Sequence, residues 1–280
     1  MNVNGFEVRD GILDLSESQI TDIESKAFLS ARLVREVWLP AGLSHIGDWA
    51  FAKCTNLRKV KFADDFRPGV FGKEVFRGCE MLESIEFADS DPQTAALLAL
   101  TANKLAYDHL LRSDDVGRKS WYEKWDISLV AKLKSDDAEA KMSAALCGEE
   151  DISYDGIGSV DGEMPGETED FVKKEEYKKC SLCYIRLSND KHLGDKTREV
   201  ICDHIIYNRF GEGSGHSFFA IFEECKSDLG YLQIYLDTVK PDKHTIKDMI
   251  NAISSKDVYA KSFLIGQTGD AQGAFDDLML

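Results

Sequence analysis

The sequence predicts a short α/β solenoid, built of parallel strands and helical turns, followed by an all-helical domain. Three observations support this prediction. A pattern recurs after 23 residues and again after 25, two apolar spacings alternate within each copy, and helical periodicity takes over after residue 91. We expect the repeats, with an N-terminal capping strand, in residues 1–91 and the helical domain in residues 92–280.

Each copy of the repeat combines two spacings of apolar residues. The segment ITDIESKAFLSARLVREVWL (20–39) aligns with LSHIGDWAFAKCTNLRKVKF (43–62), and VFGKEVFRGCEMLESIEF (70–87) is a third copy. Intervals of three and four in A-F-x-x-C-x-x-L predict a helical turn with one buried side. The alternation in V-x-F predicts a strand. Because each unit buries its apolar face on its neighbours, stacked copies would place their strands in parallel.

The spacing L-x-x-V-x-F resembles the leucine-rich repeat, and I-G-x-x-A-F-x-x-C-x-x-L-x-x-V is similar to its bacterial surface-antigen (BspA-like) subclass. The usual Asn or Cys after the strand is absent; Gly42, Asp65 and Ser90 lie near that point. The third copy also begins irregularly, after DDFRPG. The resemblance implies a strand face that binds partners.

The alternation within the strands also predicts which residues point outward. If the apolar pairs Val37/Leu39, Val60/Phe62 and Ile85/Phe87 are core, the residues between them form one outward column. We expect this column to bind a partner; it consists of Asp14, Trp38, Lys61 and Glu86. Trp38 is its most informative member, since amphipathic aromatic residues often anchor interfaces. The alternative is that Trp38 packs on a flanking loop or on the helical domain.

Helical spacing dominates the second two-thirds of the chain. One helix is expected to begin near Asp91 or Pro92, and Trp121, Trp125 and Leu129 mark one face of another. Further helices are expected at EEYKKCSLCYIRL, KTREVICDHIIYNRF and HSFFAIFEEC. Helix pairs near 228–270 resemble ankyrin-like repeats, although T-P-L-H is missing. The K-x-x-A-A-L segment at 141–146 and the C-x-x-R-L segment at 183–187 resemble a helical domain that follows such repeats in other bacterial proteins.

Residues 148–170 form an acidic insertion. They carry nine acids, five glycines and no base, and so supply −9 of the net charge of −16. Such a composition is typical of a flexible linker.

The composition and the N-terminal residues also bear on which partners the protein binds and where in the cell it is located. A net charge of −16 argues against nucleic acid and against anionic membrane surfaces, and no apolar run approaches transmembrane length. The start MNVNGFEVRDG lacks the order of a secretory signal, so we expect a cytoplasmic protein. A chain whose signal had been removed would look the same, so the cell surface is the alternative. The seven cysteines are expected to be reduced thiols.

The candidates for chemistry are weak. Cys180, Cys183, Cys202 and His204 form the best metal-ligand spacing, but a C-x-x-C pair inside a continuous helix favours buried thiols that pack as small hydrophobes. The segment DISYDGIGSVDGE (151–163) resembles a calcium loop but has Gly162 where a bidentate Glu is needed. The segment GEGSGHS (211–217) lacks the residues of a P-loop or a nucleophile elbow. We therefore expect no metal, no cofactor and no enzymatic activity.

Three functions of different classes remain. The leading hypothesis is a protein that binds an unidentified protein or peptide through its repeat surfaces. The first alternative is a cell-surface adhesion protein, which the repeat subclass implies. The second is a metal-binding or enzymatic helical domain that uses the region from Cys180 to His204.

Overall fold

A computed structural model describes residues 2–3, 5–63, 70–105, 108–135 and 165–268. The chain forms two compact units. The first comprises Met1–Leu129 together with Asn189–Gly194, and the second comprises Val130–Ser188 together with Asp195–Leu280.

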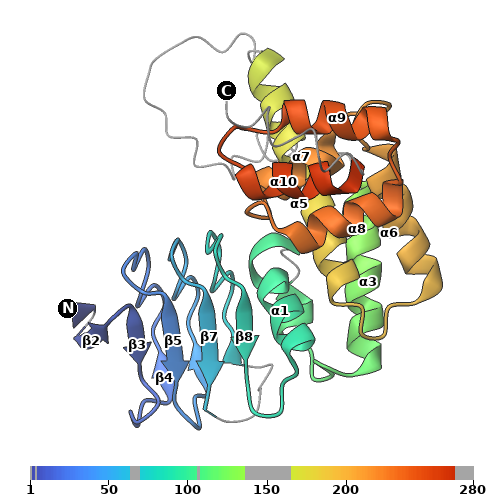
Figure 1. Ribbon diagram of the computed structural model, residues 1–280. Coiled ribbons are helices and arrows are strands. Elements are labelled where there is room, and N and C mark those ends of the chain that lie inside the picture. The colour runs from blue at the N-terminus through green and yellow to red at the C-terminus, as the bar shows by residue number, and fades with distance from the viewer. Residues whose placement is uncertain (1, 4, 64–69, 106–107, 136–164, 269–280) are drawn as a thin grey trace. The chain divides into compact units, whose positions relative to one another are not determined.

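The first unit contains a six-stranded sheet in the order β1-β2-β3-β5-β7-β8 (Figure 1). The first two strands pair antiparallel and so cap the sheet, whereas β3, β5, β7 and β8 run parallel. The strands are β1 (Asn2–Val3), β2 (Phe6–Arg9), β3 (Ile12–Asp14), β5 (Glu36–Leu39), β7 (Lys59–Phe62) and β8 (Ser84–Glu86). The predicted short parallel strands are therefore present. In place of the single N-terminal capping strand that was predicted, the structure has an antiparallel pair, β1 and β2, followed by the first parallel strand, β3.

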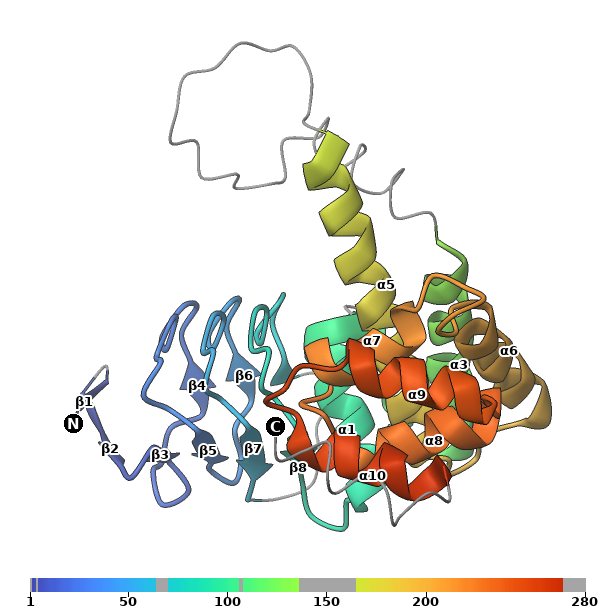
Figure 2. The same ribbon diagram turned by 45° about the horizontal axis from the view of Figure 1, so that its top comes forward.

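A second, smaller sheet was not predicted from the sequence. It pairs β4 (Asp22–Ile23) with β6 (His45–Ile46) in parallel, and Phe71 adds a bridge to Ile46. Figure 2 shows β4 and β6 side by side, apart from the strands of the larger sheet. Ile23 and Ile46 occupy equivalent positions of the first two copies and are both buried, but two residues are too short a run for alternation to be recognised.

The segments expected to be helical turns are series of tight turns. Equivalent residues of the three copies, Lys26, Trp49 and Glu74, have positive φ angles of 61°, 54° and 50°, which no right-handed helix contains. The N–H groups of the first two residues form hydrogen bonds to the next repeat. The Lys26 N–H donates to the Asp48 carbonyl, and the Trp49 N–H donates to the Lys73 carbonyl. The physical reason is that a helix satisfies its N–H groups internally, whereas these turns direct them to the next repeat.

A stack of aromatic rings forms the core of the repeats. Phe51, the aromatic residue of the A-F-x-x-C-x-x-L pattern in the second copy, is fully buried and lies between Phe28 and Phe76, with ring centroids 5.0 and 5.8 Å away. Two buried thiols at equivalent positions each form a hydrogen bond to the preceding copy. Cys54 Sγ donates to the Phe28 carbonyl, and Cys79 Sγ donates to the Phe51 carbonyl, each at 3.1 Å. The hydrogen bond with Cys54 and burial raise the pKa of the Cys79 thiol well above its usual value.

The first unit continues from the sheet into helices α1 (Pro92–Leu100), η2 (Thr101–Leu105), α2 (Asp108–Leu111) and the start of α3 (Lys119–Lys134). The helix expected near Asp91 or Pro92 begins there, because Asp91 caps it by accepting from the Thr94 N–H. Helix α1 packs beside β8 (Figure 1). Two fully buried indoles hold α3 in place, since Trp121 donates to the Leu110 carbonyl and Trp125 donates to the Thr101 hydroxyl.

A distant segment, residues 189–194, completes the first unit. Lys191 Nζ lies 2.7 Å from Asp91 Oδ2, and the Lys191 N–H donates to the side chain of Gln93. Partial burial opposes ionisation of Asp91, but hydrogen bonds from Lys191 and Thr94 outweigh it and lower the pKa of Asp91 to about 2.

The second unit is helical in its described residues. Its helices are α5 (Pro165–Ser188), α6 (Asp195–Tyr207), α7 (His216–Glu223), α8 (Leu229–Val239), α9 (Lys243–Ala252) and α10 (Val258–Thr268). They agree with the helical segments predicted from the sequence, and Asp242 caps α9. The likeness of the last three helices to ankyrin repeats stays a prediction. The K-x-x-A-A-L segment and most of the acidic insertion lie outside the described residues.

Candidate functional site

The four outward residues predicted from the alternation lie in one column across the sheet. Asp14 is opposite Trp38, Trp38 is opposite Lys61, and Lys61 is opposite Glu86 in the parallel register. The residues on either side of them are buried, and Val37 and Val60 fully so. Phe87 is the exception: it was expected in the core with Ile85, but it is only half-buried because β8 ends one residue before it. The alignment of the repeats therefore places these four side chains on one strand face.

Trp38 is half-buried on this face, and two residues of the strands make polar contacts with it. Its Nε1 donates to Glu36 Oε2 at 3.3 Å, and Lys61 Nζ lies 5.7 Å from its ring centroid. This distance allows a cation–π attraction, which orients the lysine along the face.

A second outward column, which the sequence analysis did not name, accompanies the first. Glu36, Lys59 and Ser84 are opposite one another in the same register. Lys59 Nζ lies 2.9 Å from Glu86 Oε1, and this contact raises the pKa of Lys59. The same alternation could have identified this column, since Glu36 and Lys59 stand two residues before Trp38 and Lys61.

The strand face opens into a pocket of about 650 Å³, called here the strand-face pocket. Trp38, Lys61 and Glu86 line it from the sheet. Pro92, Ala95 and Ala96 of α1 also line it. This helical wall was not predicted from the sequence, because it depends on how α1 packs beside β8, which no strand pattern encodes.

Apolar groups and engaged hydroxyls make up most of the remaining wall. Phe62 and Phe87 contribute from the ends of β7 and β8. The three serine hydroxyls of the pocket already have partners within the wall: Ser16 donates to Asp14, Ser84 donates to Glu86, and Ser90 accepts from the Phe87 N–H.

Of the charged side chains that line the pocket, the two carboxylates form ion pairs with basic neighbours and the lysine forms none among the described residues. Glu86 has Lys59 at 2.9 Å, and Glu83 has Arg58 at 3.8 Å. Lys61 has no ion pair among the described residues, and its Nζ lies over the Trp38 ring. The pocket therefore presents one uncompensated cation beside an apolar wall within the described part of the chain.

The metal candidates lie on two helices of the second unit. Cys180 and Cys183 are fully buried in α5, and burial raises the pKa of both thiols. Cys202 is partly exposed on α6, and His204 Nε2 faces Glu176 Oε2 at 3.6 Å. Within the described residues no group of three or more His, Cys, Asp and Glu side chains is arranged to hold a metal ion.

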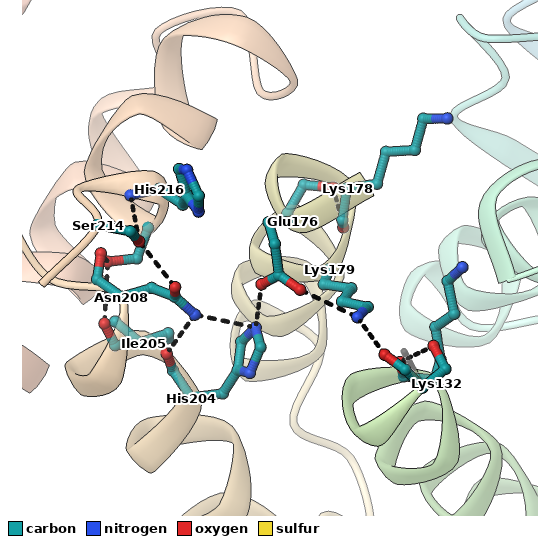
Figure 3. A network of polar contacts seen from close by, with 12 residues as sticks. Lys132, Glu176, Lys178, Lys179, His204, Ile205, Asn208, Ser214 and His216 are labelled. Carbon is teal, nitrogen blue, oxygen red and sulfur yellow. Dashed lines mark hydrogen bonds and ion pairs between the residues drawn. The ribbon is translucent and has the colours of Figure 1, made fainter. Parts of the chain in front are cut away.

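A network of polar side chains surrounds His204 (Figure 3). Glu176 joins it to Lys179, a buried lysine that lies 3.0 Å from Glu176 Oε1 and donates to the Ser135 carbonyl. On the other side, Asn208 Nδ2 lies 3.4 Å from His204 Nε2. The network links α5 to α6 and to the end of α3, which is a structural role for buried charges.

The glycine-rich segment GEGSGHS adds to this network. Ser214 Oγ donates to Asn208 Oδ1 at 2.8 Å and accepts from the His216 N–H, so its hydroxyl has no histidine as a base (Figure 3). Gly215 precedes α7 with a φ of +78°. The segment therefore connects α6 to α7. The calcium-loop candidate at 151–163 lies outside the described residues.

No described helix is both long enough and apolar enough to span a bilayer. All six cysteines within the described residues are free thiols.

Comparison with known proteins supports the repeat part of the chain. A search of curated proteins and a search of solved structures each returned no match. Residues 13–95, which run from within β3 to within α1, match the BspA type leucine rich repeat region in six copies.

Proposed function

We propose that this chain is a non-enzymatic protein–protein interaction module that binds a protein or peptide on its strand face. The observation that carries the proposal is the column of Asp14, Trp38, Lys61 and Glu86, which lies in register and opens into the strand-face pocket. Stacked repeats commonly bind partners along such extended surfaces.

The chemistry of the column suits an interface. Trp38 offers a large amphipathic surface that is half-buried before any partner binds, so little conformational entropy is lost on binding. Lys61 and Asp14 add charge of both signs at its edge, which favours orientation of a partner over raw affinity.

The test is affinity capture from a lysate of the source cell, with the purified chain beside a Trp38→Ala/Lys61→Glu double variant. A partner that the unchanged chain retains and the double variant loses is the expected result. Lys73→Glu is the matched control, because Lys73 is exposed on the turn side of the repeats and does not line the pocket. Equal recovery by all three proteins would contradict binding through the strand face.

The match to BspA type repeats favours one second candidate, a cell-surface adhesion protein. The two candidate functions require different cellular locations, and we propose that the protein is cytoplasmic. Cell fractionation followed by immunoblotting separates them: recovery in the cytosolic fraction alone excludes adhesion, and recovery at the cell surface excludes the cytoplasmic proposal.

A further inference from the structure

The strand-face pocket has the size of a binding site for one or two side chains. Its volume of about 650 Å³ falls within the range of ordinary ligand pockets. It stays open because the helix wall consists of small residues, Ala95 and Ala96, after Pro92.

The walls favour an apolar group. Phe62 and Phe87 lie on the sheet side and the two alanines lie on the helix side. Burial of an apolar side chain among these groups would remove its surface from water, which is the main source of affinity in such pockets.

Among the polar groups that line the pocket, one charged side chain is available to form an ion pair with a ligand. The serine hydroxyls are engaged within the wall, and the carboxylates of Glu83 and Glu86 each have a basic neighbour. Lys61 is exposed, has no ion pair among the described residues, and lies over the Trp38 ring at 5.7 Å. The charge that complements this arrangement is negative.

From this geometry we infer that the strand-face pocket receives an aliphatic or aromatic side chain of a peptide segment, with an adjacent Asp or Glu carboxylate paired to Lys61. The inference rests on the proposed function and adds the chemistry of the partner. It predicts that an acidic-apolar pair of neighbouring residues is the recognised feature, even though the chain as a whole is acidic, with a net charge of −16.

A selection of random displayed peptides on the immobilised full chain tests this inference. The expected result is enrichment of peptides with an Asp or Glu within two positions of Leu, Ile, Phe or Trp. Enrichment of basic peptides, or of apolar peptides without an acid, would overturn the inference.

An enriched peptide is then synthesised in three forms, unchanged, with its acid replaced by the matching amide, and with its apolar residue replaced by alanine. Fluorescence polarisation measures the binding of each form. We expect the amide form to bind about tenfold more weakly, since it loses a charge-assisted hydrogen bond. We expect the alanine form to bind at least about tenfold more weakly, since it buries less apolar surface. Higher salt should weaken the acidic peptide more than its amide form.

Three variants of the protein complete the test. Lys61→Glu should weaken the acidic peptide about tenfold and leave the amide peptide nearly unchanged. Ala96→Leu should block the pocket, because Ala96 lines it and is only partly buried. Lys73→Glu should leave all three peptides unchanged. If Lys61→Glu weakened the binding of the acidic and amide peptides equally, the proposed pairing of a carboxylate with Lys61 would be wrong.

The outcomes separate this inference from the proposed function. If no peptide is enriched while partner capture still depends on Trp38 and Lys61, the partner is recognised as a folded surface and this inference alone fails. If capture is also independent of both residues, the proposed function fails with it.

Discussion

Phe28 and Phe51 stack with their ring centroids 5.0 Å apart and their planes 11° from parallel, although 23 residues separate them in the chain. Phe51 in turn stacks on Phe76 of the next copy, with centroids 5.8 Å apart. This stack is the direct structural counterpart of the repeat in the sequence, because equivalent positions of successive copies contact one another.

Loss of the central ring should destabilise the repeats strongly. Phe51→Ala is expected to cost about 3–5 kcal/mol of unfolding free energy, since it removes a fully buried ring and leaves a cavity. Urea denaturation followed by circular dichroism measures the effect. Leu33→Ala is the control, because Leu33 is 49% exposed and should cost little. A loss below about 1 kcal/mol for Phe51→Ala would contradict the stacked register.

Two glycines at equivalent positions permit close approach between repeats. A Cβ at Gly47 would lie 2.3 Å from the backbone nitrogen of Ser25, and one at Gly72 would lie 2.7 Å from the Ile46 carbonyl oxygen. Gly47→Ala is therefore expected to cost about 1–3 kcal/mol through overpacking. Thermal unfolding compares it with Gly194→Ala, where the Cβ meets open space. Similar melting temperatures for both variants would mean that the repeats are spaced more widely.

Asp91 should make a pH-dependent contribution to stability. The pKa of Asp91 is about 2 when folded, below its usual value of 3.8, so its contribution is present above pH 4 and is lost as the pH falls toward 2. Asp91→Ala should cost about 1 kcal/mol near pH 6 through loss of the helix cap, and less at pH 3. Chemical denaturation at both pH values measures the difference. A cost that does not change with pH would exclude the ionised carboxylate as its source.

The cysteines should differ in reactivity in the folded protein. Cys202 is partly exposed on α6, whereas Cys54, Cys79 and Cys183 are fully buried. Because thiol alkylation requires access and thiolate formation, Cys202 should react with iodoacetamide well before these three. Peptide mass spectrometry after timed labelling at pH 8 reports each site. Labelling of Cys183 as fast as Cys202 would show that α5 opens readily.

The network around Glu176 and His204 should be independent of metal. The side chains of this network bond to one another, and His204 faces Glu176 and Asn208. We therefore expect no stoichiometric zinc in the purified chain and no change in melting temperature after treatment with a chelator. Elemental analysis combined with thermal unfolding checks both points. One zinc per chain, lost together with stability, would revive the candidates Cys180, Cys183, Cys202 and His204.

The sequence by itself determined the parts of the fold that depend on local periodicity. Repetition at intervals of 23 and 25 residues identified Phe28, Phe51 and Phe76 as equivalent, and alternation placed Trp38 and Lys61 on one strand face. Helical spacing identified the buried face of Trp121 and Trp125. These features follow from side-chain direction, which has a fixed period along each element.

Only the tertiary structure decided what lies between the elements. The turns of Lys26, Trp49 and Glu74 took the place of the expected helical turns, because their N–H groups find carbonyl partners in the next repeat. The pocket between Trp38 and Ala96 exists because α1 packs beside β8 with small residues on that side. Contacts of this kind join residues distant in sequence, and local periodicity carries no record of which surfaces will meet.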